Sequence, residues 1–441
     1  MNMHAHTPLI VGITDARTRA VLALEDGTRR RHVHIVGQTG TGKSTLLQHM
    51  IAQDLAAGRG VAVIDPLGNL AQAVLGLVPS HRAHELVYLN PTDLERPIGF
   101  NVLEQVHPDK HAVVADDIVS AFVHIWGATA VADRSQQVLR NSIRALMQSP
   151  GTTLLAIPRL LTDHTYRTRI VGRIRDPVVL AYWRNQFAAY DDAFRTLVIA
   201  PILNKLDAVL SAGALRNIIG QPKSTIDLRK IMDEGRILIV NMSKGVLGEG
   251  NAHLLGAFLV SKFAQAAFSR ADTPESERRP FYLYADEFQD YASAGFTRIL
   301  SQARNYALAL TLAHQYLGQL SEALRQAVLG NAASFIALRI GAEDAPLIAA
   351  HLGLEPDVQT SGMGTHETPP EKLLLTLPNY AAWMRFLSDD APSGATLVEM
   401  LPPPKPINHR PHRLITNSRV RFGRERAVVE DKIARFLGGQ M

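Results

Sequence analysis

A glycine-rich run that ends in a lysine and two hydroxyl residues lies at 37–45, between an apolar stretch at 32–36 and a helix-like stretch at 46–51. Backbone N–H groups of such a loop curl around phosphates, and the following helix points its positive end at them. Lys43 is expected to reach the outer phosphates, and the Ser44 hydroxyl to bind Mg²⁺. The run therefore predicts an ATP site. Its residues are Gly37, Gln38, Thr39, Gly40, Thr41, Gly42, Lys43, Ser44 and Thr45.

A pair of carboxylates follows the apolar run 281–285. Asp286 is expected to hold Mg²⁺, and Glu287 to act as the general base on an attacking water molecule. A pair that caps a helix is the alternative interpretation of these two residues taken alone. Together with the phosphate loop they predict ATP hydrolysis, because phosphoryl transfer needs chiefly positioning and charge neutralisation.

Two polar residues flank the apolar run 308–312. Gln315 follows the run and is expected to sense the γ-phosphate, if this strand lies next to the Asp286 strand. Arg304 precedes the run and is a candidate finger for the site of a neighbouring subunit. A capping amide and a surface salt bridge are the structural alternatives, and the pattern alone leaves them open. The predicted catalytic residues are Lys43, Glu287, Arg304 and Gln315, and the predicted metal ligands are Ser44 and Asp286.

Several histidines and one aspartate carry weaker signals. His32 and His34, like His81 and His84, have no acidic or cysteine cluster nearby, so we interpret them as ordinary strand or surface residues. No metal other than magnesium is predicted. Asp65 precedes a proline at the end of an apolar run and is expected to form a turn, with a place in the lining of the nucleotide site as the alternative.

Short apolar runs recur between helical stretches, and each run is apolar on both faces. This is typical of parallel strands in a sheet that helices cover on both sides. Because the phosphate loop follows the first run, the sequence predicts an α/β fold, a RecA-like P-loop NTPase core with a mostly parallel central sheet. The predicted strands lie at 61–64, 86–88, 237–240, 281–284, 308–312 and 335–338.

Between 108 and 226 the pattern changes to helical periodicity, with Val114, Ile118 and Phe122 on one face. We interpret this segment as an all-alpha domain inserted into the core. An exposed loop is expected at 361–370. The predicted divisions are 1–107 and 227–401 for the two parts of the core, 108–226 for the insertion, and 402–441 for a Pro-rich basic tail with a short helix.

The C-terminal segment is basic. The chain has a net charge of +5, and residues 402–441 contain nine Lys and Arg against three Asp and Glu. An amphipathic helix is predicted at 424–437, after the prolines at 402–404. Such a segment either follows a phosphate backbone or an acidic membrane surface, or is a solvated tail with a surface helix. Both interpretations stay open.

Composition places the chain among large globular proteins, with 441 residues, 46% hydrophobic and 20% charged. Its lack of cysteine excludes disulfides and thiolate metal sites. No stretch approaches the length of about eighteen apolar residues that a membrane span needs, and the N-terminal residues do not resemble a signal peptide. We expect a cytoplasmic protein without a transmembrane segment of its own. Peripheral contact with the inner membrane through partners is left open.

Several short segments together resemble the cytoplasmic ATPase of type IV secretion coupling proteins, the TraD-like motors of conjugative DNA transfer. These proteins belong to the FtsK/HerA superfamily of DNA-pumping motors. The resemblance extends from about Val33 to Leu401. Besides the phosphate loop, the segments that carry it are 90–101, 215–222, 284–289, 312–315, 329–331 and 339–344.

The resemblance implies a hexameric ring that moves DNA through a central channel at the expense of ATP. It assigns Lys43, Ser44, Asp286, Glu287, Gln315 and Arg304 the roles given above, with Arg304 acting between subunits. The insertion sits where the family carries its all-alpha domain, which faces the DNA-processing machinery that delivers the substrate. Relaxosome or secretion-channel proteins are the further partners that the resemblance suggests.

Two features depart from the family pattern. Membrane-anchored members usually carry transmembrane helices before the motor, which is not seen in the thirty or so residues before Val33. Family members also often carry a lysine and a second acid after the Asp-Pro of the next strand, where this chain has Leu67-Gly-Asn69. A HerA-like helicase or translocase in repair or phage defence is therefore an alternative, as is an ATP-dependent scaffold that recruits a protein partner.

Overall fold

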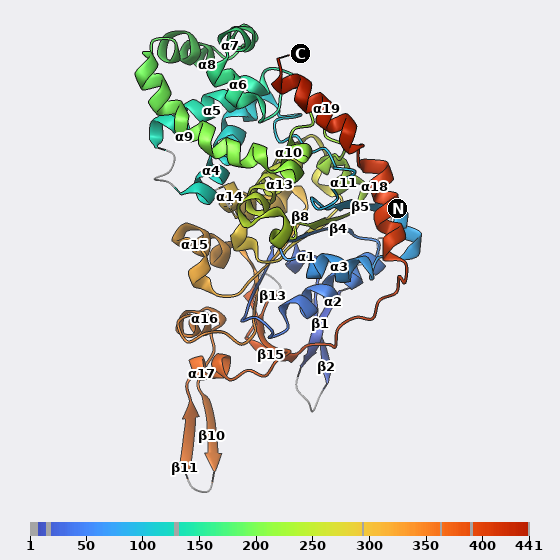
Figure 1. Ribbon diagram of the computed structural model, residues 1–441. Coiled ribbons are helices and arrows are strands. Elements are labelled where there is room, and N and C mark those ends of the chain that lie inside the picture. Colours follow the sequence, from blue (N-terminus) through green and yellow to red (C-terminus); the bar gives the residue numbers. More distant parts are fainter. Residues whose placement is uncertain are drawn as a thin grey trace.

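The structure, a computed structural model, describes residues 8–14, 19–127, 132–292, 295–361, 364–388 and 391–439. An eleven-stranded sheet runs through its middle, with helices on both faces (Figure 1). The strand order is β2-β1-β15-β12-β9-β3-β8-β7-β4-β6-β5. The strands are β1 (Leu9–Thr14), β2 (Ala20–Leu24), β3 (Val33–Val36), β4 (Gly60–Asp65), β5 (Leu86–Leu89), β6 (Ile237–Asn241), β7 (Phe281–Ala285), β8 (Leu308–His314), β9 (Ser334–Ala337), β12 (Ala381–Arg385) and β15 (Thr396–Glu399).

The strands from β9 to β5 in this order are all parallel, and each predicted apolar run forms one of them. Alternate residues of a strand enter opposite cores. In β4, Val61 and Val63 pack on the side of α2 (Lys43–Ala56) and α3 (Asn69–Leu75), whereas Ile64 packs on the side of α13 (Glu249–Ser269). Burial of both faces explains the continuous apolar runs.

Four antiparallel strands extend the sheet beyond β9, and the sequence does not predict them. β12 pairs with β9 and β15, while β1 pairs with β15 and β2. These strands are less completely buried: Trp383 and Arg385 of β12 are half-buried, and Val21 of β2 is exposed. β12 and β15 each end in a charged residue, whereas β1 and β2 are short apolar runs that are not among the predicted strands.

A separate hairpin of β10 (Asp357–Ser361) and β11 (Gly364–Thr368) projects from the body of the molecule (Figure 1). The helix α17 (Pro370–Leu375) follows it directly. The predicted loop at 361–370 is therefore wrong, because paired strands occupy most of this range. The remaining helices outside 108–226 and before the tail are α1 (Asp26–Arg29), α11 (Leu228–Glu234), α12 (Lys244–Leu247), α14 (Gly295–Gln302), α15 (Glu322–Asn331) and α16 (Ala345–Leu352).

The chain between β5 and β6 forms the helices at the top of Figure 1. No strand occurs in 108–226 as far as the structure describes that range. Val114, Ile118 and Phe122 of α4 are buried, and α4 packs on α5 and α13. The exact domain boundaries stay a prediction. The helices are α4 (His111–Trp126), α5 (Asp133–Met147), α6 (Ala156–Thr162), α7 (His164–Val171), α8 (Pro177–Ala181), a π-helix (Tyr182–Phe187), α9 (Asp192–Ser211) and α10 (Gly213–Ile219).

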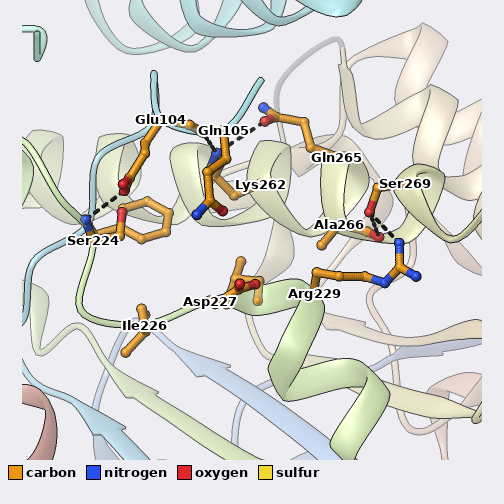
Figure 2. A pocket seen from close by; sticks show the side chains of 12 residues that line it. Glu104, Gln105, Ser224, Ile226, Asp227, Arg229, Lys262, Gln265, Ala266 and Ser269 are labelled. Atoms are coloured by element: carbon orange, nitrogen blue, oxygen red, sulfur yellow. Dashed lines mark hydrogen bonds between the residues drawn. The ribbon is translucent and has the colours of Figure 1, made fainter. Parts of the chain in front are cut away.

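Figure 2 shows where the chain leaves the core for this helical segment and returns. Lys262 of α13 donates a hydrogen bond from Nζ to the backbone carbonyl oxygen of Glu104, over 2.5 Å. The backbone N–H of Ser224 donates to Glu104 Oε2 over 2.6 Å. These residues line a cavity of about 230 Å³, and burial lowers the pKa of Lys262 to about 8 against the opposing effect of Glu104 and Asp227. The outgoing and returning segments are thereby tied to each other and to α13.

The C-terminal segment runs along one side of the molecule as two helices, α18 (Pro411–Phe422) and α19 (Arg426–Leu437) (Figure 1). The sequence predicts only the second. α18 lies against the edge strand β5, where Ser418 Oγ accepts a hydrogen bond from the backbone N–H of Tyr88 over 2.7 Å. An open strand edge is a template for pairing with other chains, so α18 protects this side of the sheet.

α19 packs on the helical segment 108–226 through α10. Arg159 Nη1 donates to the backbone carbonyl oxygen of Phe436 over 2.9 Å, and Asn217 Nδ2 donates to Glu430 Oε1 over 3.1 Å. The basic segment is therefore packed on the protein rather than free. Among the described helices, none alone has the length and apolar composition to cross a membrane; α9 and α10 meet both criteria only as a pair, which is bent by 100°.

Candidate nucleotide-binding and hydrolysis site

The phosphate loop joins β3 to α2. Gly40 and Gly42 have φ angles of +80° and +121°, which favour glycine. The backbone N–H of Gly37 donates to the carbonyl oxygen of His314 over 3.3 Å, and that of Gln38 to the carbonyl oxygen of Arg339 over 2.8 Å. The loop is therefore held by the last residue of β8 and by the chain that follows β9, the strands on either side of β3.

Lys43 is the first residue of α2 and is buried. Its Nζ donates to the carbonyl oxygens of Gly37, over 2.6 Å, and Gln38, over 3.2 Å. Burial lowers the pKa of this ammonium, while Glu287 and Asp286 oppose the shift. The ammonium group of Lys43 thus interacts both with the loop and with the two carboxylates. Its positive charge is available to neutralise a bound phosphate group.

The hydroxyl residues of the loop differ in exposure. Thr41 is buried, and its Oγ1 donates to the carbonyl oxygen of Gln38 over 2.7 Å, which helps to shape the loop. Thr39 and Ser44 are exposed, and Thr45 is half-buried. An exposed hydroxyl beside Lys43 is available to a metal ion that accompanies a triphosphate.

Asp286 follows β7, and its backbone N–H donates to the carbonyl oxygen of Ile64 in β4 over 3.1 Å. Burial, together with the nearby carboxylates of Asp65 and Glu287, raises the pKa of Asp286 to about 7. A carboxyl group crowded by two others is stabilised in its charged form by a cation, and Mg²⁺ prefers oxygen ligands. The donors present therefore fit Mg²⁺, and Asp286 and Ser44 are the residues that would hold it.

Glu287 is held from both sides. Its Oε1 accepts a hydrogen bond from Gln315 Nε2 over 2.9 Å, and its Oε2 accepts one from Gln289 Nε2 over 2.8 Å. The residue has a φ angle of +45°, which is uncommon outside glycine and typical of functional sites. β7 and β8 are neighbours, as the expectation for Gln315 requires. The structure thus brings Glu287 and Gln315 together in a geometry that can orient a water molecule.

Arg304 lies elsewhere. It is exposed on a short 3₁₀ turn (Ala303–Tyr306) that precedes β8, whereas Gln315 follows this strand. β8 has seven residues, so its two ends are about 20 Å apart. An arginine side chain does not cover that distance, and Arg304 therefore does not reach the site of its own chain.

Asp65 forms the predicted turn. Its Oδ1 accepts from the backbone N–H of Leu67 over 2.8 Å, and its Oδ2 accepts from that of Ala71 over 2.9 Å. The buried carboxylate therefore orders the start of α3, and its charge also raises the pKa of Asp286.

Two residues at the site are not singled out by the sequence analysis. Gln289 holds Glu287 and lies within the segment 284–289, where an amide two residues after the acidic pair is the available signal. Tyr380 donates from its backbone N–H to the carbonyl oxygen of Thr41 over 2.8 Å, has a φ angle of +66°, and is 47% exposed beside Gly42. It comes from the antiparallel extension, so no local pattern marks it.

Residues 16–169 match the model of a protein family described as the type IV secretion-system coupling protein DNA-binding domain. A comparison with curated protein sequences finds no match.

Solved structures share the fold. The unbound bacterial conjugative coupling protein TrwBdeltaN70 superposes with a TM-score of 0.62 and 15% identity over 86% of each chain. The plasmid coupling protein TrwB in complex with ADP and Mg²⁺ gives 0.63 and 15%, over 91% of this chain and 95% of that one. VirB4 of Thermoanaerobacter pseudethanolicus gives 0.56 and 14%, over 90% and 97%.

These similarities confirm the predicted α/β fold, with its mostly parallel sheet and additional helical domain. Through the family of residues 16–169 and through its overall fold, the chain resembles the type IV secretion coupling proteins.

Proposed function

We propose that this chain is a P-loop ATPase that couples ATP hydrolysis to the movement of DNA through a ring of identical subunits, in conjugative transfer or type IV secretion. The observation that carries the proposal is the contact of 2.9 Å between Gln315 Nε2 and Glu287 Oε1. It joins a candidate base to a candidate γ-phosphate sensor on neighbouring strands, within the electrostatic reach of Lys43.

In this mechanism the phosphate loop and Lys43 bind the triphosphate, and Glu287 accepts a proton from the attacking water. Gln289 and Gln315 orient the Glu287 carboxylate before the water arrives. Asp286 and Ser44 would hold Mg²⁺, which would neutralise charge on the phosphate oxygens. Gln315 links the state of the γ-phosphate to β8, and Arg304 at the far end of that strand acts on the next subunit.

The comparisons support DNA as the partner. The family matched by residues 16–169 is described as a DNA-binding domain, and TrwB is described as a conjugative coupling protein that has been studied with ADP and Mg²⁺ and with a non-hydrolysable ATP analogue. A hexamer is proposed because Arg304 needs a neighbouring site and motors of this kind form rings. Relaxosome or secretion-channel proteins are the proposed further partners, through which a cytoplasmic motor would reach the inner membrane.

The test is the rate of ATP hydrolysis by the full chain with and without single- and double-stranded DNA, across a salt series, alongside the mass of the assembly. DNA should raise the rate, and the stimulation should weaken as salt increases because phosphate contacts release counterions. Hydrolysis that ignores DNA would favour a scaffold with a nucleotide switch. Assembled protein that does not hydrolyse ATP with either form of DNA would overturn the motor.

A further inference from the structure

A groove lies between α7 and α19, two helices that are far apart in the sequence but both near the top of Figure 1. Its volume is about 500 Å³, within the range of pockets that bind ligands. α7 and the residues after it contribute Tyr166, Arg169, Ile170 and Arg173, at the i, i+3, i+4 and i+7 spacing of one helix face. The opposite wall of the groove is formed by α19, in the C-terminal segment.

The wall from α19 has the same chemistry, with Lys432 and Arg435 beside Ile433 and Phe436. Both apolar residues are at least half-buried, whereas both basic residues are exposed. α19 lies against Gly220, where an added Cβ would lie 3.0 Å from Ile433 Cδ1 and 2.5 Å from Leu155 Cδ1.

The described charged residues that line the groove are all basic. Arg169, Arg173, Lys432 and Arg435 line it, and no Asp or Glu is among the described lining residues. Part of the charge is balanced nearby, since Arg435 Nη2 lies 2.8 Å from Asp431 Oδ2. The Arg169 guanidinium lies 5.0 Å from the centre of the Tyr166 ring. Basic side chains thus surround an apolar floor.

We propose that this groove docks a segment of a partner protein, an amphipathic helix with an apolar seam and acidic edges. Apolar side chains of the seam fill the space between Ile170 and Ile433, and carboxylates along the edges pair with the arginines and the lysine. A phosphate backbone would match the charges but leave the apolar floor uncovered. Helices that lie in grooves are recognised by this combination of spaced apolar anchors and flanking charges.

The proposal is tested with a fluorescein-labelled synthetic helix of about four turns, with leucine at i, i+3, i+4 and i+7 and glutamate at the flanking positions. Fluorescence anisotropy with the full chain should show saturable binding that weakens as salt increases. The variant Arg173→Glu with Lys432→Glu should weaken it by about tenfold or more. Replacing the leucines of the peptide by glutamine should abolish binding.

The matched control is Lys405→Glu with Arg413→Glu. It makes the same change in net charge with exposed residues of the basic segment that do not line the groove. The control should bind the peptide like the wild type, and circular dichroism should show that both variants are folded. Neither pair belongs to the nucleotide site, so ATP hydrolysis without DNA should be unchanged in both.

Three results would overturn the proposal. One is the absence of saturable peptide binding, and another is an equal loss in the two charge-reversed variants. The third is that Arg173→Glu with Lys432→Glu impairs binding to a short DNA duplex or to vesicles with anionic lipid while peptide binding is unaffected. None of these results depends on whether the chain hydrolyses ATP.

Discussion

The Nε2 atoms of His34 and His314 lie 2.7 Å apart in the interior of the protein, with the planes of the two imidazole rings within 8° of parallel and their centroids 4.9 Å apart. His314 Nδ1 lies 3.1 Å from the carbonyl oxygen of Tyr316, so it carries the proton, and its Nε2 accepts the proton on His34 Nε2. The pair joins β3, which leads into the phosphate loop, to β8, which is followed by Gln315. One proton on each ring accounts for both of these contacts, so both rings are neutral.

Acid should unfold the protein through its buried histidines. Burial lowers the pKa of His314 to about 3 and that of His32 to about 4. The unfolded chain takes up these protons near pH 6.5, so the contribution of these two histidines to the free energy of unfolding is complete above that pH and falls as the pH drops towards 4. At about pH 5 the loss is about 2 kcal/mol for each of the two residues. Urea unfolding at several pH values measures it.

The variant His314→Gln isolates one of these contributions. Its loss of unfolding free energy between about pH 7.5 and pH 5 should be smaller than that of the wild type by about 2 kcal/mol. His84→Gln is the control, because His84 is exposed. Equal pH dependence in the wild type and His314→Gln would contradict the assignment.

Asp286 should show a conflict between stability and activity. Its folded-state pKa is raised to about 7, so the stability it contributes is complete below its ordinary pKa of 3.8 and is lost as the pH rises through 7. Without Mg²⁺ and nucleotide, Asp286→Asn should therefore raise the free energy of unfolding by roughly 2 to 4 kcal/mol at about pH 8, and by less at about pH 5. The same variant should lose Mg²⁺-dependent hydrolysis.

The variant Asp290→Asn should change the free energy of unfolding in the opposite direction. Asp290 Oδ2 accepts a hydrogen bond from Lys244 Nζ over 3.0 Å, and despite burial its pKa is lowered by this contact and by His253. A carboxylate with a lowered pKa stabilises the folded state at neutral pH, so its removal should destabilise the protein. Stabilisation by Asp290→Asn would contradict the lowered pKa of Asp290. Destabilisation by Asp286→Asn at about pH 8 would contradict the raised pKa of Asp286.

The central strands and the phosphate loop are predictable because their signals are local. A strand buried on both faces needs a continuous apolar run, and a loop that binds phosphates needs its glycines and its lysine in order. The proximity of Glu287 and Gln315 is also predictable, because adjacent parallel strands end at the same edge of a sheet.

Other features depend on contacts between distant segments. His34 and His314 are 280 positions apart, and neither has a neighbour in sequence that would mark it as paired. α18 contains Leu414 and Ser418 as its buried residues. Its basic, polar sequence is typical of a solvated tail, and only its contact with β5 shows that it is packed on the protein. Tyr380 reaches the phosphate loop only because β12 and β15 extend the sheet, and nothing near Tyr380 in the sequence marks the pairing of these strands with β9 and with each other.

Glu287→Gln should separate nucleotide binding from turnover. The side chain keeps its size, so ATP binding measured by equilibrium titration should stay within about twofold of the wild type. The amide cannot accept the proton from water, and hydrolysis should fall by about a hundredfold or more. Glu322→Gln, at an exposed position on α15, is the control for a general effect of losing one negative charge. Normal hydrolysis by Glu287→Gln would remove this residue as the base.

Arg304 should act between subunits, because β8 separates it from the site of its own chain. Arg304→Ala and Lys43→Ala should each lose most hydrolysis alone, since loss of such an arginine commonly lowers turnover by about a thousandfold or more. In mixed rings, an Arg304→Ala subunit keeps its Lys43 and receives an intact Arg304 from its Lys43→Ala neighbour, so part of the activity should return. Mixing Arg304→Ala with the double variant Lys43→Ala, Arg304→Ala supplies no intact arginine and should restore nothing. If native mass spectrometry verifies mixed assembly and the first mixture is as inactive as the second, Arg304 does not serve a neighbouring site.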